Sequence, residues 1–283
     1  DGLGVTPIAM PMNEAGEVDV EGLEALLKRM DKAGTLNRLK ALYLVSYFAN
    51  PTGHSISEST KSVIGSVLSQ LDQTIAVIED AAYRELYYET PHSARSCLSV
   101  DTFTGMPILY TSTLTKPYAS GLKVGYAYCT DESWMAAILS VKGQQDFGTA
   151  NFAQAIVERA LSSGSFDRHV TELRAIYKQK METLHGALES KLSELGWTWP
   201  VPVGALYLWL RSPNEMRTDG DSDFHAACIE NGVFYVPGDL CYPSNRIQDR
   251  IRLSFGALRP YYIEEAASRF SLAAKSMTRA VSG

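Results

Sequence analysis

A lysine that directly follows a strand-like run is the first residue of this chain that could do chemistry. Lys116 lies in the segment Thr111-Ser112-Thr113-Leu114-Thr115-Lys116-Pro117-Tyr118, just after the run 107–113. A lysine in such a place, among hydroxyl side chains, can be partly desolvated, which disfavours its ammonium form. Only the neutral amine is nucleophilic, so the position suits a lysine that forms a Schiff base with an aldehyde. Taken alone, the residue is best interpreted as an idle, solvated loop lysine, which is the commoner case.

Two more polar residues end predicted strands. Asp80 closes the run 74–78 that continues through Glu79, and Asn50 follows the run 41–45 and opens the turn signal Asn50-Pro51-Thr52-Gly53. Ligands of parallel α/β sheets bind beyond the carboxyl ends of the strands, which makes both residues candidates for a site. The alternatives are that Glu79-Asp80 caps a following helix and that the segment 50–53 is only a turn.

Arg252 is a candidate for binding a carboxylate. It lies in Arg250-Ile251-Arg252-Leu253-Ser254-Phe255, where the alternation of a strand puts Arg250 and Arg252 on one face. The guanidinium fork matches a carboxylate with two parallel hydrogen bonds. Position alone does not choose between the two arginines, and an exposed strand arginine without a ligand is the alternative.

The elements that must position these residues alternate along the chain. Strands are expected at 6–12, 41–45, 74–78, 107–113, 124–129, 206–210, 233–236 and 251–255, and helices at 16–30, 57–71, 132–141, 152–161, 167–195, 223–230 and 262–277. This alternation predicts an α/β fold with a mainly parallel sheet covered by helices. We expect a large domain over residues 1–163 and a smaller C-terminal α+β domain over residues 164–283 that includes the long helix.

Composition narrows the classes of partner. The net charge of −6 gives no electrostatic reason to expect nucleic acid or an anionic membrane as partner. No run of about 18 apolar residues and no secretory signal at the start are visible. The four cysteines are widely spaced and the five histidines lack ligand spacing, so we expect reduced thiols, a cytoplasmic protein and no metal site.

The segment around Lys116 resembles the active-site segment of fold-type I enzymes that use pyridoxal 5'-phosphate (PLP), in particular the class I/II aminotransferase family. In that family a hydroxyl residue lies three positions before the lysine and a basic residue seven positions after it, which are Thr113 and Lys123 here. The family's basic residue is usually arginine, so Lys123 is a departure. A lysine keeps the charge for a phosphate and loses the bidentate fork.

The resemblance also implies roles for the other candidates. Asp80 would keep the pyridinium nitrogen protonated, and Tyr83, three residues on, would donate to the phenolate oxygen of the cofactor. Asn50 belongs to the family's Asn-Pro-Thr-Gly element and would bind the same oxygen, with a cis peptide before Pro51. The string Arg-Leu-Ser-Phe selects Arg252 as the residue that binds the substrate α-carboxylate.

The activity implied by the resemblance is that of a PLP-dependent aminotransferase, which moves an amino group between an amino acid and a 2-oxo acid. Lys116 would hold PLP and then act as general base, while Thr113 and Lys123 bind the phosphate. The similarity leans towards aromatic, aminoadipate-type or broad-specificity enzymes. The alternatives are a PLP-dependent lyase of the aminocyclopropane-carboxylate-synthase type, an aminotransferase-like sensor domain of a transcriptional regulator, and a chain that binds no cofactor.

Members of the family carry a further N-terminal part with a glycine-rich turn, whose backbone amides cradle the cofactor phosphate. The sequence contains no candidate for that turn, so the large domain is expected to be incomplete. Uncovered sheet edges and core surface then call for partners. We expect a homodimer or completion by another chain, and neither nucleic acid nor membrane as partner.

Overall fold

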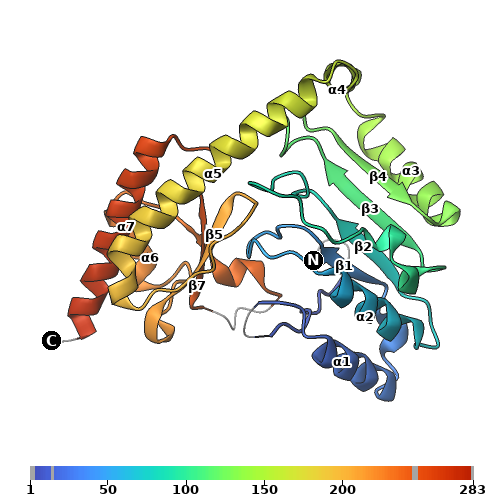
Figure 1. The fold of residues 1–283 in the computed structure, drawn as a ribbon. Helices are drawn as coiled ribbons and strands as arrows, with labels where there is room; N and C mark the ends of the chain where they lie inside the picture. Colours follow the sequence, from blue (N-terminus) through green and yellow to red (C-terminus); the bar gives the residue numbers. More distant parts are fainter. Residues whose placement is uncertain (1–3, 14–15, 244–247, 282–283) are drawn as a thin grey trace. The chain divides into compact units, whose positions relative to one another are not determined.

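Two sheets, one of four strands and one of three, organise the computed structural model (Figure 1). It describes residues 4–13, 16–243 and 248–281. These residues fall into two compact units, which we call the four-stranded unit (residues 10–49 and 54–173) and the three-stranded unit (residues up to 9, 50–53 and from 174 on). Each unit is described by itself.

The sheet of the four-stranded unit follows the chain order. It contains β1 (Ala41–Val45), β2 (Ala76–Asp80), β3 (Ile108–Thr113) and β4 (Gly125–Cys129), with neighbours in that order. The first three strands are parallel and β4 is antiparallel to β3. A mixed sheet with helical connections confirms the predicted α/β class and the mainly parallel pairing.

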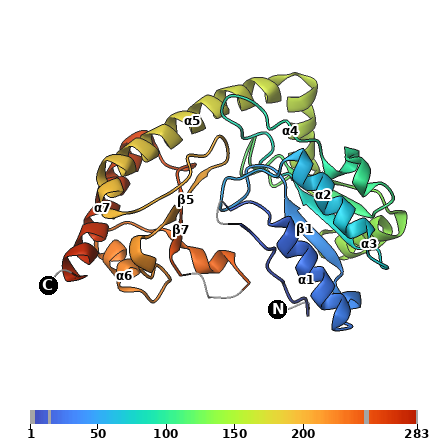
Figure 2. The ribbon, with the colours of Figure 1, turned by 60° about the horizontal axis from the view of Figure 1, so that its bottom comes forward.

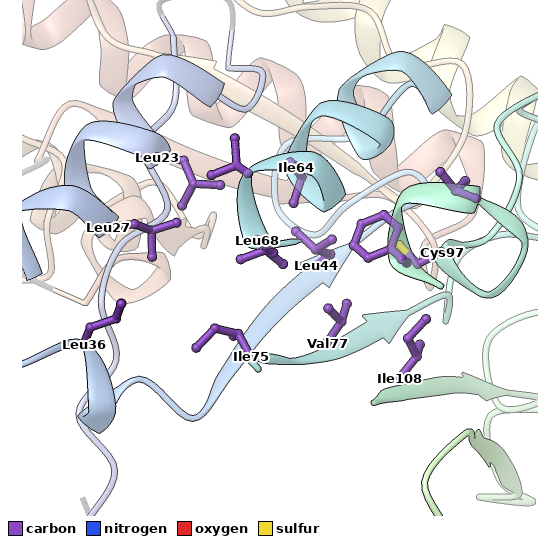
Figure 3. Close-up of a cluster of buried hydrophobic side chains, with 13 residues drawn as sticks. Leu23, Leu27, Leu36, Leu44, Ile64, Leu68, Ile75, Val77, Cys97 and Ile108 are labelled. Atoms are coloured by element: carbon purple, nitrogen blue, oxygen red, sulfur yellow. The ribbon is translucent and has the colours of Figure 1, made fainter. Parts of the chain in front are cut away.

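One face of this sheet is covered by α1 (Val20–Lys32) and α2 (Glu58–Ser69). Strand alternation turns Leu44, Val77 and Ile108 to this face, because residues paired in a parallel ladder point the same way. Figure 3 shows their buried side chains packed with apolar residues of both helices. These residues are Leu23 and Leu27 of α1 and Ile64 and Leu68 of α2. Ser57 caps α2 by accepting a hydrogen bond from the Thr60 backbone amide, as its hydroxyl and position predict.

The opposite face of the same sheet carries the next residue of each strand. Tyr43 is exposed, and Val45, Ile78, Asp80 and Thr111 are only partly buried. This face is therefore open in the described part of the four-stranded unit, and we call it the open face.

Two further helices follow the sheet, α3 (Glu132–Asp146) and α4 (Asn151–Ser162). Helix α4 packs Ala153 and Val157 against Val124 and against the partly buried Leu114 and Leu122. It therefore supports the connection between β3 and β4, which contains Lys116.

The long helix α5 (Ser165–Leu192) is visible in Figure 1. Its residues up to Leu173 belong to the four-stranded unit, and those from Arg174 on belong to the three-stranded unit. A short 3-10 turn, Ser193–Leu195, ends it at Gly196, whose φ of 79° is left-handed. Glycine adopts this conformation without steric cost, which confirms the predicted end of the helix.

The three-stranded unit pairs β5 (Tyr207–Arg211) and β6 (Val236–Pro237) on either side of β7 (Arg250–Ser254), all antiparallel. Two helices complete it, α6 (Asp223–Glu230) and α7 (Pro260–Val281), both visible in Figure 2. Aromatic rings of Trp197, Phe224 and Phe270 meet with centroids 5.2 to 5.4 Å apart and form its core.

Two strand predictions were wrong: one strand is absent from the described residues, and the other is shorter than expected. The described residues in 6–12 form no strand, and only Met12 makes an isolated bridge, with Val18. Loose alternation produces a strand only where a partner strand lies beside it. The strand expected at 233–236 is the two-residue β6, because pairing with β7 is confined to Val236 and Pro237. Among the described helices, none combines the length and apolarity needed to cross a membrane.

Candidate functional site

Asp80 is the last residue of β2 and belongs to the open face of the four-stranded unit. Its Oδ2 accepts a hydrogen bond from the Tyr43 hydroxyl at 2.5 Å, and its Oδ1 accepts one from the Ala82 amide at 2.8 Å. A turn follows Asp80 and no helix does, so the interpretation of Glu79-Asp80 as a helix cap was wrong. In the ladder Asp80 pairs with Thr111, five residues before Lys116.

Lys116 lies in the turn after β3, next to the aromatic ring of Tyr83. Its Nζ is 5.9 Å from the ring centroid of Tyr83, within the range of a cation–π contact. Tyr83 is 7% exposed and Lys116 is partly buried. The structure thus brings together two residues that are 33 positions apart and that the sequence placed in one site.

Thr113 shapes the start of the loop that carries Lys116. Its hydroxyl donates to the Val124 carbonyl at 3.1 Å and accepts from the Thr115 amide at 3.0 Å. Thr113 is paired with Gly125 in the β3–β4 ladder, so Lys123 lies at the same end of this strand pair. Lys123 is exposed and has a φ of 54°, a strained conformation for a non-glycine residue of the kind found at functional sites.

His169 supports the same loop from α5, which the sequence did not indicate. Its Nε2 lies 2.9 Å from the Tyr118 carbonyl oxygen, and its ring meets the Tyr118 ring edge-on with centroids 5.2 Å apart. Because only the tertiary fold brings α5 to residue 118, the helical pattern around His169 predicted nothing beyond surface or packing.

Two of the predicted site residues, Asn50 and Arg252, lie in the three-stranded unit. Arg252 donates from Nη1 to the Asn50 side-chain oxygen at 2.6 Å, and its guanidinium carbon lies 4.6 Å from the ring centroid of Tyr207. Its Nε is buried without a hydrogen-bond partner among the described residues. A buried donor without a partner is costly unless a ligand satisfies it. The peptide between Asn50 and Pro51 is cis, as predicted.

Glu79, the neighbour of Asp80, faces the other way and is fully buried with Lys61. The Lys61 Nζ is 2.9 Å from Glu79 Oε1, and both side chains are 0% exposed. Glu79 Oε2 accepts from the Cys97 amide at 2.9 Å and from the Ser96 hydroxyl. Burial by itself raises the pKa of Glu79, but the charge of Lys61 and the hydrogen bonds outweigh it and hold the pKa below its usual value.

Tyr43 is held as a neutral hydrogen-bond donor. Burial, then its hydrogen bond to Asp80 and the charge of that carboxylate, raise the pKa of Tyr43 well above its usual range. No sequence motif indicated Tyr43 as a site residue. Its position could have indicated the contact. Tyr43 lies two residues before Val45 on the same face of the strand, and the parallel register pairs Val45 with Asp80.

Comparison with known proteins agrees with this fold. The profile of the family described as aminotransferase class I and II matches residues 2–270. A 2-aminoadipate transaminase of Thermus thermophilus is 26% identical over 272 residues, which are 95% of this chain and 64% of that protein. The transcriptional regulator NorG of Staphylococcus aureus is 25% identical over 251 residues, 88% of this chain and 51% of the regulator.

A solved structure is similar over the same range. The kynurenine aminotransferase of Pyrococcus horikoshii superimposes with a TM-score of 0.84 at 26% identity, covering 95% of this chain and 64% of that one. This α/β fold places Lys116 after β3 and Asp80 at the end of the neighbouring β2. The chain belongs to the aminotransferase class I and II family. It spans less than two thirds of the length of each of these three relatives.

The residues of the four-stranded unit fit PLP by their chemistry. Each carboxylate oxygen of Asp80 has one donor and can accept a second, as from a ring N–H. Lys116 supplies an amine, and Thr113 and Lys123 supply a hydroxyl and an exposed ammonium for a phosphate. In the three-stranded unit, the unsatisfied Nε of Arg252 suits a carboxylate.

Proposed function

We propose that this chain is the catalytic portion of a PLP-dependent aminotransferase, which moves an amino group between an amino acid and a 2-oxo acid. The observation that carries the proposal is Lys116 against the Tyr83 ring, in the unit where Asp80 ends the neighbouring strand with acceptor capacity left. Membership in the family supports it.

Lys116 and Asp80 have the central roles in this proposal. Bound PLP supplies an aldehyde carbon that takes up amines and a ring that accepts the electron pair left on the substrate Cα. Lys116 would hold the cofactor through its amine, and as a free amine it would take the proton from the substrate Cα. Asp80 accepts the hydrogen bond of the ring nitrogen and, through its negative charge, keeps that nitrogen protonated.

The other residues bind and orient. Tyr83 and Asn50 donate to the phenolate oxygen, and the Asn50 amide can do so because its oxygen already accepts from Arg252. Thr113 and Lys123 bind the phosphate. Arg252 holds the substrate α-carboxylate, which fixes the Cα bond that must break.

We propose an aromatic, aminoadipate-type or broad range of amino acids as substrates. The similar proteins include enzymes named for 2-aminoadipate and for kynurenine. The ring of Tyr207 beside the Arg252 guanidinium adds an aromatic surface next to the proposed carboxylate site.

The open face of the four-stranded sheet supports a partner. Half-buried Val45, Ile78 and Thr111 surround Asp80 there, and parallel sheets are usually covered on both faces. We propose a homodimer or completion by another chain.

We further propose two domains, over residues 1–163 and 164–283. The widely spaced cysteines support a cytoplasmic location, because they suggest reduced thiols.

The covalent link to Lys116 tests the proposal. Purified protein with PLP should show an absorption band near visible wavelengths, and borohydride reduction followed by peptide mass spectrometry should locate the cofactor on Lys116. Lys116→Ala should lose both signals, while Lys142→Ala, an exposed lysine of α3, should keep them. A label on any other lysine, or none on the wild type, would overturn the proposal.

A sensor domain is the second candidate, because NorG is a transcriptional regulator that matches 88% of this chain. Half-reactions separate the candidates. An aminotransferase changes its cofactor absorbance when an amino acid is added and recovers when a 2-oxo acid follows. A lyase releases product without the 2-oxo acid, a sensor binds PLP without turnover, and a chain that binds no cofactor shows no spectrum.

A further inference from the structure

The hydrogen bond between Tyr43 and Asp80 joins two neighbouring strands on the open face. The parallel register pairs Val45 with Asp80 and Tyr43 with Ile78, so the Tyr43 side chain reaches diagonally across two residues to the carboxylate. Its hydroxyl donates to Asp80 Oδ2 at 2.5 Å. The contact therefore depends on the end of β1 lying in register with the end of β2.

This bond completes the fixation of the carboxylate. The Ala82 amide holds Oδ1 from the turn that follows, and Tyr43 holds Oδ2 from the neighbouring strand. Donors on both oxygens stop rotation of the carboxylate about its last bond. A hydrogen bond to an ionised oxygen is also about twice as strong as one between neutral groups.

The ring of Tyr43 contributes little else to the fold. Its side chain is 55% exposed and lies on the open face, away from the core under α1 and α2. The raised pKa of Tyr43 keeps its hydroxyl protonated, so no second negative charge forms beside Asp80.

We propose that Tyr43 is a positioning residue, which holds the Asp80 carboxylate in the orientation that meets the ring nitrogen of the cofactor. The inference rests on the proposed function and adds a residue that acts through Asp80 without touching the cofactor itself. A plain cross-strand contact with no effect on the cofactor is the competing explanation.

Binding of pyridoxamine 5'-phosphate, which needs no covalent bond to Lys116, tests the role. Tyr43→Phe should weaken its affinity about three- to tenfold, because the Asp80 carboxylate is then no longer preorganised for the ring nitrogen. In the Asp80→Asn background the same replacement should change the affinity less than about twofold, since the two residues act as one unit. Tyr128→Phe, an exposed tyrosine of β4, is the matched control and should bind like the wild type.

The ring nitrogen itself gives a spectroscopic readout. With ¹⁵N in the ring of bound pyridoxamine 5'-phosphate, Tyr43→Phe should move the nitrogen resonance towards the value seen in Asp80→Asn. Wild-type affinity and an unmoved resonance in Tyr43→Phe would overturn the inference alone. A wild-type protein that binds no pyridoxamine 5'-phosphate would overturn the proposed function together with it.

A measurement without cofactor checks the contact. Tyr43→Phe should lower the urea midpoint of unfolding in the Asp80 protein and leave it unchanged in the Asp80→Ala background, which has no side chain to accept the hydrogen bond. Equal shifts in both backgrounds would show that the two side chains do not interact, which contradicts the inference.

Discussion

Glu79 and Asp80 are adjacent carboxylates of β2 that face opposite sides of one sheet. Glu79 is 0% exposed and is saturated by its own chain, with Lys61, Ser96 and the Cys97 amide as partners. Asp80 is partly buried and has one donor on each oxygen.

The difference shows how one strand can supply both structure and chemistry. A buried charge is tolerated only when its partners come from the protein itself, which makes Glu79 and Lys61 part of the core. Asp80 keeps acceptor sites for something outside the described chain. Because side chains alternate along a strand, the rigid anchor lies one residue from the proposed reactive group.

Removing one partner of the buried pair should give the largest effect. Glu79→Gln should cost about 3–5 kcal/mol of unfolding free energy, because it leaves the Lys61 ammonium buried without its counter-charge. Urea unfolding followed by circular dichroism measures the loss. The double replacement Lys61→Met/Glu79→Leu should recover much of it, since an apolar pair leaves no buried charge. A loss under about 1 kcal/mol for Glu79→Gln would contradict the assignment of a structural role.

The neighbouring replacement should act on the cofactor and spare the fold. Asp80→Asn should reduce the affinity for pyridoxamine 5'-phosphate about 10- to 100-fold, since a hydrogen bond to a charged group contributes about 1.5–3 kcal/mol. Its unfolding free energy should change by less than about 1 kcal/mol, because the asparagine oxygen still accepts a hydrogen bond. Isothermal titration and urea unfolding of the same samples give both numbers. If Glu79→Gln and Asp80→Asn changed the unfolding free energy equally, the proposed difference between the structural and the cofactor-binding carboxylate would be wrong.

Low pH should remove the contribution of the buried Glu79 carboxylate to the unfolding free energy. The pKa of Glu79 is lower in the folded chain than its ordinary value of 4.5, so its contribution to stability is full above that value and is lost as the pH falls through the folded pKa. The difference in unfolding free energy between wild type and Glu79→Gln should therefore be constant near neutral pH and shrink below about pH 4.5. Urea titrations over a pH series measure it, and a difference that grows in acid has the wrong sign for this explanation.

The smallest effect is expected for an exposed ion pair between α2 and the loop that follows β2. Glu58 of α2 accepts from Arg95 at 2.8 Å, but both side chains are more than a third exposed. Solvent screens such pairs, and they add little to stability. Glu58→Gln should shift the urea midpoint far less than Glu79→Gln, and added salt should reduce the shift further. A shift as large as that of Glu79→Gln would mean that burial does not separate the two pairs.

Local sequence signals were sufficient for most of the helices and strands. The run that ends in Asp80, the cis peptide at Asn50-Pro51 and the helix end at Gly196 were predicted and are present. Each depends on a residue type at a fixed offset within a few positions. The strand expected at 6–12 failed for the converse reason, since a strand needs a partner that local alternation does not supply.

The sequence by itself determined the α/β class and the family, because strand alternation, turn residues and motif spacing are written in neighbouring positions. Only the tertiary structure decided that Glu79 meets Lys61, that Tyr43 binds Asp80 and that His169 supports the loop of Lys116. The partners in these three contacts are 18, 37 and 51 positions apart in the sequence, the last being His169 and Tyr118. Strand register and helix packing bring such residues together, and both are set by the burial of the whole core rather than by any short stretch of chain.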